Sequence, residues 1–174
     1  TGGKVTVRVF AGNSPFGKTE NQADQVKQGV VDVAWGLNGI PRGRYPRSSI
    51  MEMPFVAESA ASASKALWAM LPTTLAEDYK GLKVLALHCH NPGLFHTRDK
   101  KIEKLEDVKG LRMRAPNPPT QALLAYLGAT PVGMPPTQVY ENIEKGVIDG
   151  AVFPWDAIKG FRLEGVLKYH FDAR

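Results

Sequence analysis

Two distant stretches of the chain share one construction, in which a helix-like run ends at a glycine and an apolar run containing an aspartate follows. Residues 28–34 read Gln-Gly-Val-Val-Asp-Val-Ala, and residues 145–151 read Lys-Gly-Val-Ile-Asp-Gly-Ala. Glycine readily takes the left-handed conformation that ends a helix, and a short apolar run is typical of a buried strand. Another strand-like run precedes each stretch, at residues 5–10 and 129–134. The repeat predicts two α/β lobes with a cleft between them, although coincidence is an alternative because such joints are common.

The composition is that of an ordinary globular protein. The chain has 174 residues, of which 43% are hydrophobic and 22% charged. No run approaches the roughly 20 apolar residues of a transmembrane helix, so we expect the chain not to be embedded in a membrane. The net charge of +5 comes without a helical basic stripe interleaved with aromatic residues, which argues against nucleic-acid binding. The single cysteine, Cys89, excludes an intramolecular disulfide and fits cytoplasm and periplasm equally.

Strand-like and helix-like segments alternate along the chain, which predicts an α/β fold with a mainly parallel sheet flanked by helices in each lobe. The sequence Asn-Pro-Gly at residues 91–93 breaks this rhythm. We expect the chain to cross there from a first lobe, residues 1–91, to a second lobe, residues 92–174. The expected strands are residues 5–10, 30–35, 82–87, 94–97, 111–115, 129–134 and 147–151, and the expected helices are residues 19–28, 59–71, 118–127 and 135–145.

Residues 12–19 read Gly-Asn-Ser-Pro-Phe-Gly-Lys-Thr and match the phosphate loop G-x-x-x-x-G-K-[ST] letter for letter. Asp32 imitates the magnesium-binding aspartate of phosphate-loop enzymes. Against this, the preceding strand alternates with polar residues, and only 12 residues separate Thr19 from Asp32. The twin aspartate, Asp149, also has no such loop before it. A nucleotide-binding enzyme that uses Gly12 to Thr19 is therefore kept as the alternative hypothesis.

Histidines flank the cysteine in His88-Cys89-His90, which places both imidazoles on one face of a strand at the spacing of metal ligands. A third ligand would have to come from His96 or from a distant carboxylate, so structural histidines at a strand end are the favoured interpretation. The sequence contains no G-x-S-x-G nucleophile elbow. We therefore predict no catalytic residue, no metal and no cofactor, and a protein that binds without turnover.

Arg114 ends a short predicted strand, just before Pro116 and Asn117. Ligands of open α/β sheets collect at the carboxyl ends of strands, and a planar guanidinium there suits a carboxylate. A surface arginine in an ion pair is the alternative. Arg112 is expected to face the opposite side of the strand and so to serve as a control.

Residues 35–38 follow the first repeat and residues 153–156 follow the second, each at the end of a predicted strand. These two segments converge with Arg114 if the lobes face each other. For the two tryptophans among them, core packing is an equally favoured alternative. The predicted ligand-binding residues are Arg114, Asn117, Trp35, Leu37, Asn38, Phe153, Trp155 and Asp156.

Residues 105–116, Leu-Glu-Asp-Val-Lys-Gly-Leu-Arg-Met-Arg-Ala-Pro, closely resemble a hallmark segment of TRAP-transporter solute-binding proteins, the DctP-like family. The resemblance runs in the right order over nearly the whole chain. Its other parts are residues 26–32, 53–55, 79–86, 127–132 and 139–151.

This resemblance implies a periplasmic protein with the two-lobed fold of periplasmic binding proteins. Such a protein traps an organic acid in the cleft between its lobes and delivers it to a membrane permease driven by a sodium gradient. In the family an arginine at the position of Arg114 pairs with the ligand carboxylate. Members of the family are considerably longer, so we expect this chain to be a fragment, incomplete at both ends.

Departures from family patterns narrow the ligand. Leu94 stands where some sialic-acid binders carry a second arginine, and Phe153 stands where those proteins have asparagine. The branch that binds 2-oxo acids through a cation has a Glu-Trp pair in place of Val152-Phe153. Sialic acid and metal-bridged keto acids are therefore disfavoured. An aromatic wall from Phe153, with Trp155, favours a carboxylate that carries an apolar body.

Overall fold

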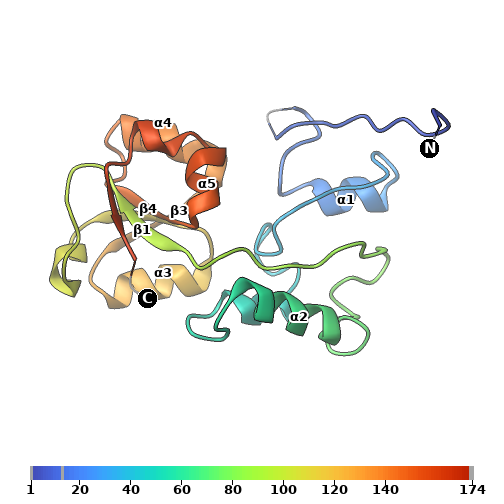
Figure 1. Ribbon diagram of the computed structural model, residues 1–174, viewed down its shortest axis with the longest axis horizontal. Helices are drawn as coiled ribbons and strands as arrows, with labels where there is room; N and C mark the ends of the chain where they lie inside the picture. The colour runs from blue at the N-terminus through green and yellow to red at the C-terminus, as the bar shows by residue number, and fades with distance from the viewer. Residues whose placement is uncertain (1, 13, 173–174) are drawn as a thin grey trace.

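The computed structural model of the protein describes residues 2–12 and 14–172. The sheet and its helices form one body, and residues 2–93 lie beside it (Figure 1). Helices and strands are α1 (Gln22–Lys27), α2 (Ala60–Met70), β1 (Leu94–Thr97), β2 (Arg112–Ala115), α3 (Pro118–Tyr126), β3 (Thr130–Gly133), α4 (Val139–Glu144), β4 (Gly150–Phe153), α5 (Trp155–Gly160) and β5 (Tyr169–Phe171). Short 3₁₀ helices lie at Ser48–Glu52, Leu105–Val108, Pro136–Gln138 and Leu163–Gly165.

The five strands form one mixed sheet in the order β3-β2-β4-β1-β5. β2 pairs in parallel with β3 and β4, whereas β1 pairs antiparallel with β4 and β5. The prediction of a mainly parallel sheet in each lobe was therefore wrong. The helices α3, α4 and α5 each carry the chain back across the sheet, so β2 to β5 run in one direction. β1 precedes these crossovers and runs against them.

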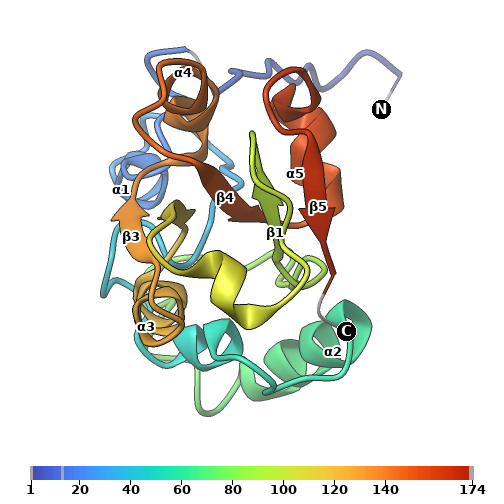
Figure 2. The ribbon, with the colours of Figure 1, turned by 90° about the vertical axis from the view of Figure 1, so that its left-hand side faces the viewer.

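Apolar side chains cover both faces of the sheet, with α4 and α5 on one face and α3 on the other (Figures 1 and 2). The first face buries Ala151 and Phe153 against Ile143 of α4 and Ile158 of α5. The second face buries residues of β2 and β4 against Leu124 of α3. β2 and β4 are thus held between two apolar layers. This packing fixes the carboxyl ends of both strands, where Arg114 and Phe153 lie.

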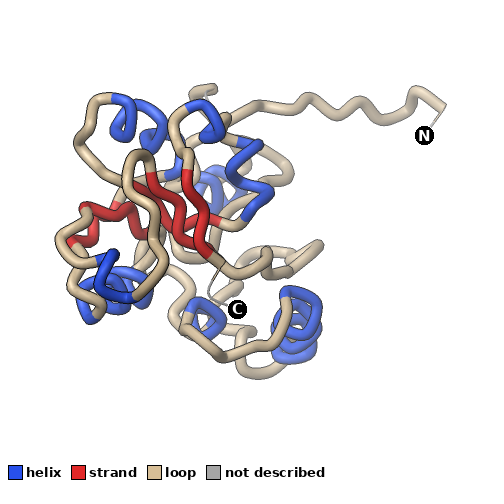
Figure 3. The backbone as a smooth tube through the Cα atoms, turned by 60° about the vertical axis from the view of Figure 1, so that its left-hand side comes forward, coloured by secondary structure: helices blue, strands red, loops and turns tan. Residues whose placement is uncertain are grey.

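The expected strands at residues 5–10, 30–35 and 82–87 do not form (Figure 3). These segments are extended, but within the described part of the chain no ladder pairs them. Many of their apolar side chains are exposed, with Val9 84% exposed and Trp35 69% exposed, whereas Val84 and Leu87 pack against a core within residues 2–93. An extended segment becomes a strand only when a neighbour satisfies its N–H and C=O groups. The division into lobes at residue 91 stays a prediction.

Residues 2–93, called the first half below, have a smaller core of their own beneath α2. Ser59 caps α2, the helix expected at residues 59–71, through a capping box with Ser62. Leu67 of α2 packs with other buried side chains, and the carboxylate of Asp78 accepts N–H and O–H bonds from Ser48. Among the described helices, none has the length and apolarity needed to cross a bilayer.

Candidate carboxylate-binding site

Arg114 lies near the carboxyl end of β2 and is only 2% exposed. Its Nε donates to the carbonyl of Met134 at 3.2 Å, and its Nη1 donates to the carbonyl of Val152 at 3.0 Å. A guanidinium carries five N–H donors, so these two bonds orient the group without using it up. The other three N–H donors have no acceptor among the hydrogen bonds of the described residues.

Burial lowers the pKa of Arg114 to about 10, so the side chain is still a cation at neutral pH. Within residues 2–12 and 14–172, no carboxylate forms an ion pair with it. Besides the two carbonyls, the ring of Phe153 stabilises the charge, and its centroid lies 4.2 Å from the guanidinium carbon. A buried charge normally has a partner of opposite sign. This arrangement is therefore suited to an anion, and the aromatic ring beside it is suited to an apolar body.

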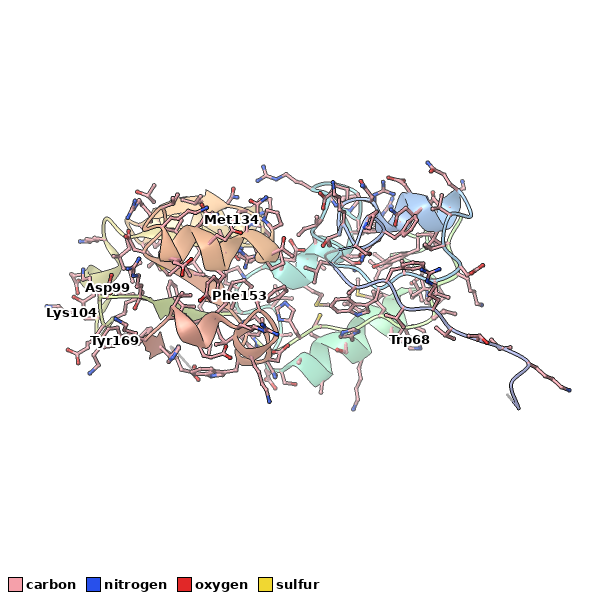
Figure 4. The ribbon with its side chains drawn as sticks, turned by 90° about the horizontal axis from the view of Figure 1, so that it is seen from above. Trp68, Asp99, Lys104, Met134, Phe153 and Tyr169 are labelled. Carbon is pink, nitrogen blue, oxygen red and sulfur yellow. The ribbon has the colours of Figure 1, made fainter. Side chains whose placement is uncertain are left out.

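Two neighbours of Arg114, Met134 and Phe153, lie on the part of the sheet body that is nearest the first half of the chain. Phe153 is the last residue of β4, and the labelled side chains of Met134 and Phe153 lie on the side of the sheet body nearest residues 2–93 (Figure 4). Asp99, Lys104 and Tyr169 lie at the outer end. A hydrogen bond of 3.1 Å from Arg42 Nη2 to Gln121 Oε1 joins the first half to α3.

Asn117 lies beside this edge as the N-cap of α3. Its side-chain oxygen accepts the backbone N–H of Thr120 at 3.0 Å, and Pro118 follows at the first helical position. The side chain thus has a structural task, while its amide N–H₂ group is left for other partners. A role for Asn117 in ligand binding stays a prediction.

Trp155 and Asp156 form the first turn of α5, two residues beyond the site wall. Trp155 is half exposed, and its ring contacts the imidazoles of His96 and His170, with centroid distances of 5.2 Å and 4.8 Å. Asp156 is exposed. Trp155 therefore packs over β1 and β5 rather than over Arg114.

The predicted residues of the first half belong to a different set of contacts. Trp35 stacks on His88 with a centroid distance of 6.4 Å. Asn38 donates to the hydroxyl of Tyr79 at 2.6 Å, and the carbonyl of Leu37 accepts from Ile40 in a turn. The described contacts do not join these three residues to Arg114, so their convergence on one ligand stays a prediction.

The expectation that Arg112 and Arg114 face opposite sides of β2 was wrong, because residues two apart on a strand share a face. They are separated along the strand instead. Arg112 begins β2, is exposed and forms a bidentate pair with Asp149, with bonds of 3.0 Å and 2.5 Å. The Arg112 guanidinium lowers the pKa of Asp149. Arg112 remains a useful control because its charge is already matched.

The phosphate-loop and metal hypotheses receive no geometric support. Asn13 lies outside the described residues, but the neighbouring loop does not follow a strand, and α1 begins only at Gln22. His90 contacts the carbonyl of the adjacent Asn91. In the described part of the chain, no three His, Cys, Asp or Glu side chains are grouped closely enough to hold a metal ion.

A cavity of about 280 Å³ lies at the opposite end of the strands, lined by charged residues that include Arg98, Arg112 and Asp149. Arg98 there donates to the carbonyl of Ile143 at 2.7 Å. Arg98 and Arg112 in this cavity are paired with Asp99 and Asp149, whereas Arg114 has no acidic partner within the described residues.

Sequence reasoning did not find the pairing of His96 with His170 beside the site. The two residues are 74 positions apart and become neighbours only through the antiparallel pairing of β1 with β5. No local sequence signal reports such a pairing.

Comparison with known proteins decides the family. All 174 residues match the family of bacterial extracellular solute-binding proteins, family 7, called DctP. The chain belongs to this family. The predicted family, the non-enzymatic class and the periplasmic location are confirmed by this match and by its relatives.

Two solved structures are similar to this DctP chain. A TRAP solute binding protein from a marine metagenome, specific for aromatic acid ligands and in complex with metahydroxyphenylacetate, is 43% identical, with a TM-score of 0.84 over 88% of this chain and 48% of that one. A TRAP solute binding protein from Rhodoferax ferrireducens T118, in complex with copurified benzoate, is 40% identical, with a TM-score of 0.84 over 91% of this chain and 50% of that one. They support the periplasmic-binding-protein fold.

A more distant relative is the 2,3-diketo-L-gulonate-binding periplasmic protein YiaO of Escherichia coli K12. It is 27% identical over 173 residues, which cover 97% of this chain and 52% of that protein. The chain therefore spans about half the length of the relatives that it matches.

Proposed function

We propose that the protein captures an aromatic monocarboxylate and delivers it to the membrane permease of a TRAP transporter. The observation that carries the proposal is the buried guanidinium of Arg114, which has no acidic partner in the described part of the chain and lies against the ring of Phe153. A carboxylate would neutralise the guanidinium through a bidentate pair, and an arene would pack on the aromatic wall. The solved relatives with metahydroxyphenylacetate and benzoate support this ligand class.

The proposed cleft needs two lobes. We propose that residues 1–91 and 92–174 are parts of the first and second lobe, with Arg114, Asn117, Phe153, Trp155 and Asp156 contributed by the second. Trp35, Leu37 and Asn38 would approach from the first. The hydrogen bond from Arg42 to Gln121 supports an arrangement in which the two parts meet over the end of β2.

A pair of matched ligands tests the proposal. Benzoate and benzamide have nearly the same shape, but only benzoate carries a charge at neutral pH. A ligand that binds the folded state raises its stability by about 2.7 kcal/mol at a hundred times its dissociation constant, so a thermal-shift assay on the full-length protein reports binding directly. We expect a rise in melting temperature with benzoate and none with benzamide.

The control acid is glucuronate, which has a carboxylate on a polar body. A large shift with glucuronate and none with benzoate would contradict the aromatic part of the proposal. Equal shifts with benzoate and benzamide would contradict the carboxylate part.

A further inference from the structure

His96 is fully buried in β1, and neither its position nor its chemistry is explained by apolar packing. Both of its ring nitrogens are engaged. Nε2 lies 3.0 Å from the carbonyl oxygen of Phe153, and Nδ1 lies 2.7 Å from Nδ1 of His170. A buried imidazole with two specific partners is held in one orientation.

The partners also fix which nitrogens carry hydrogen. A carbonyl oxygen only accepts, so Nε2 of His96 must be the N–H donor to Phe153. Nδ1 of the neutral His96 ring is then an acceptor, and Nδ1 of His170 must donate to it. The Phe153 carbonyl thus selects the tautomer of His96, and the more exposed His170 stabilises that tautomer by donating to Nδ1.

This tautomer connects His96 to the carboxylate site through β4. Arg114, Ala151 and His96 lie in register on neighbouring strands, with β4 in the middle. On one side of β4, Arg114 donates to the carbonyl of Val152 at 3.0 Å, and on the other side His96 holds the carbonyl of Phe153 at 3.0 Å. The end of β4, which carries the ring that lies 4.2 Å from the Arg114 guanidinium, is therefore fixed from both sides.

We propose that His96 is a positioning residue of the carboxylate site, which holds Phe153 against Arg114, and that His170 keeps His96 in the required tautomer. The assignment of a carboxylate ligand rests on the proposed function. The positioning of Phe153 over Arg114 does not, because both contacts are made within the chain itself.

Other groups around His96 do not offer its Nε2–H a competing acceptor. β5 contributes His170, α5 contributes the ring of Trp155, and β4 contributes the Phe153 carbonyl. Arg114, which is in register with His96 across β4, is the charged residue at this level of the sheet. Within the described residues, neither histidine forms an ion pair with a carboxylate.

The test compares substitutions at His96 that differ in one property. His96→Gln keeps an N–H donor that reaches the Phe153 carbonyl, whereas His96→Phe keeps a ring and removes the donor. We expect benzoate to bind His96→Gln within about threefold of the wild type and His96→Phe at least about tenfold more weakly, as a lost hydrogen bond of about 1.4 kcal/mol implies. His90→Phe, in an exposed histidine of the first half, is the control and should bind as the wild type does.

A spectroscopic signature separates positioning from general stability. Because the face of Phe153 lies over Arg114, its ring current should shift the Arg114 Nε–H proton upfield in the NMR spectrum of the ligand-free protein. The shift should persist in His96→Gln and be reduced in His96→Phe. This readout needs no benzoate, so it distinguishes a failure of this proposal from a failure of the proposed ligand.

Two results would overturn the proposal. One is an unchanged Arg114 signal in a folded His96→Phe variant, and the other is an equal loss of signal in His96→Gln and His96→Phe. If His96→Phe does not fold, His170→Phe takes its place, since it removes the donor to Nδ1 from a more exposed position. An unchanged Arg114 signal in His170→Phe would then overturn the role given to the histidine pair.

Discussion

At the scale of single residues, Arg114 and His96 are both buried polar side chains whose partners lie on neighbouring strands. The hydrogen bonds of Arg114 to two carbonyls orient its charge but do not neutralise it. Desolvation without neutralisation costs stability, and a protein retains such a group where a ligand supplies the missing charge. This cost is consistent with the ligand-binding role that we propose for Arg114.

The histidine pair makes stability depend on pH in a definite direction. Burial lowers the pKa of His96 below 6.5, His170 adds to this shift, and burial also lowers the pKa of His170. The unfolded chain takes up protons near pH 6.5 while the folded protein still resists them, so stability is full above that pH and falls below it. Urea unfolding at pH 8, 6.5 and 5.5 should show midpoints that fall slightly in the first step and more in the second.

His170→Phe is the matched variant for this prediction, because it removes one of the two titrating rings and keeps an aromatic side chain beside Trp155. Its midpoint should change less between pH 6.5 and 5.5 than that of the wild type. A wild-type midpoint that rises as the pH falls would show that other groups dominate.

At the scale of elements, the joint between helix and apolar run, which occurs at residues 28–34 and again at residues 145–151, has the same backbone geometry in both places. Gly29 and Gly146 have φ angles of +70° and +68°, and each is followed by a residue whose N–H bonds back to a helix carbonyl at 2.8 Å. The sequence therefore predicted the local geometry correctly. Only the second joint leads into a strand, because β4 has β2 and β1 on its two sides, whereas no strand of the described chain pairs with residues 30–35.

Gly146→Ala tests the need for a left-handed residue at the joint. A Cβ there would meet open space, so the cost is that of the backbone conformation alone, about 1–2 kcal/mol of unfolding free energy. Gly160→Ala is the control, because Gly160 ends α5 without a left-handed φ and also has room for a Cβ. We expect that variant to be neutral or up to about 1 kcal/mol more stable in urea unfolding. Equal losses in both variants would contradict the role of the joint.

The limits of sequence prediction lie in long-range pairing. The helices expected at residues 59–71 and 118–127 are present as α2 and α3, and the strand expected at residues 111–115 is present as β2. Local signals missed α5 and β5, since β5 has only three residues and is defined by its pairing with β1. For the same reason they indicated Arg114 and Phe153 separately but not the histidine pair that links β1 to the end of β4.

At the scale of the whole molecule, order is concentrated in the sheet body. Most of the large fully buried side chains belong to it, and the extended segments of the first half expose Val5, Val7, Val9 and Val33. In the 174-residue chain we expect amide hydrogen exchange to be slowest in the central strands β2 and β4 and fastest in residues 5–9 and 30–35. Mass spectrometry of exchanged peptides measures this. Similar protection in both halves would contradict the described arrangement.

The measurement that tests the central claim most directly is calorimetric titration of benzoate into full-length Arg114→Ala, Arg114→Lys and Arg112→Ala. Removing Arg114 leaves the ligand charge unpaired in a desolvated site, which should cost about 3–5 kcal/mol, or about two to three and a half decades of affinity. Lysine keeps the charge without the bidentate fork and should recover only part of it. Arg112→Ala should bind as the wild type does. Wild-type affinity in Arg114→Ala, with a loss in Arg112→Ala, would contradict the account.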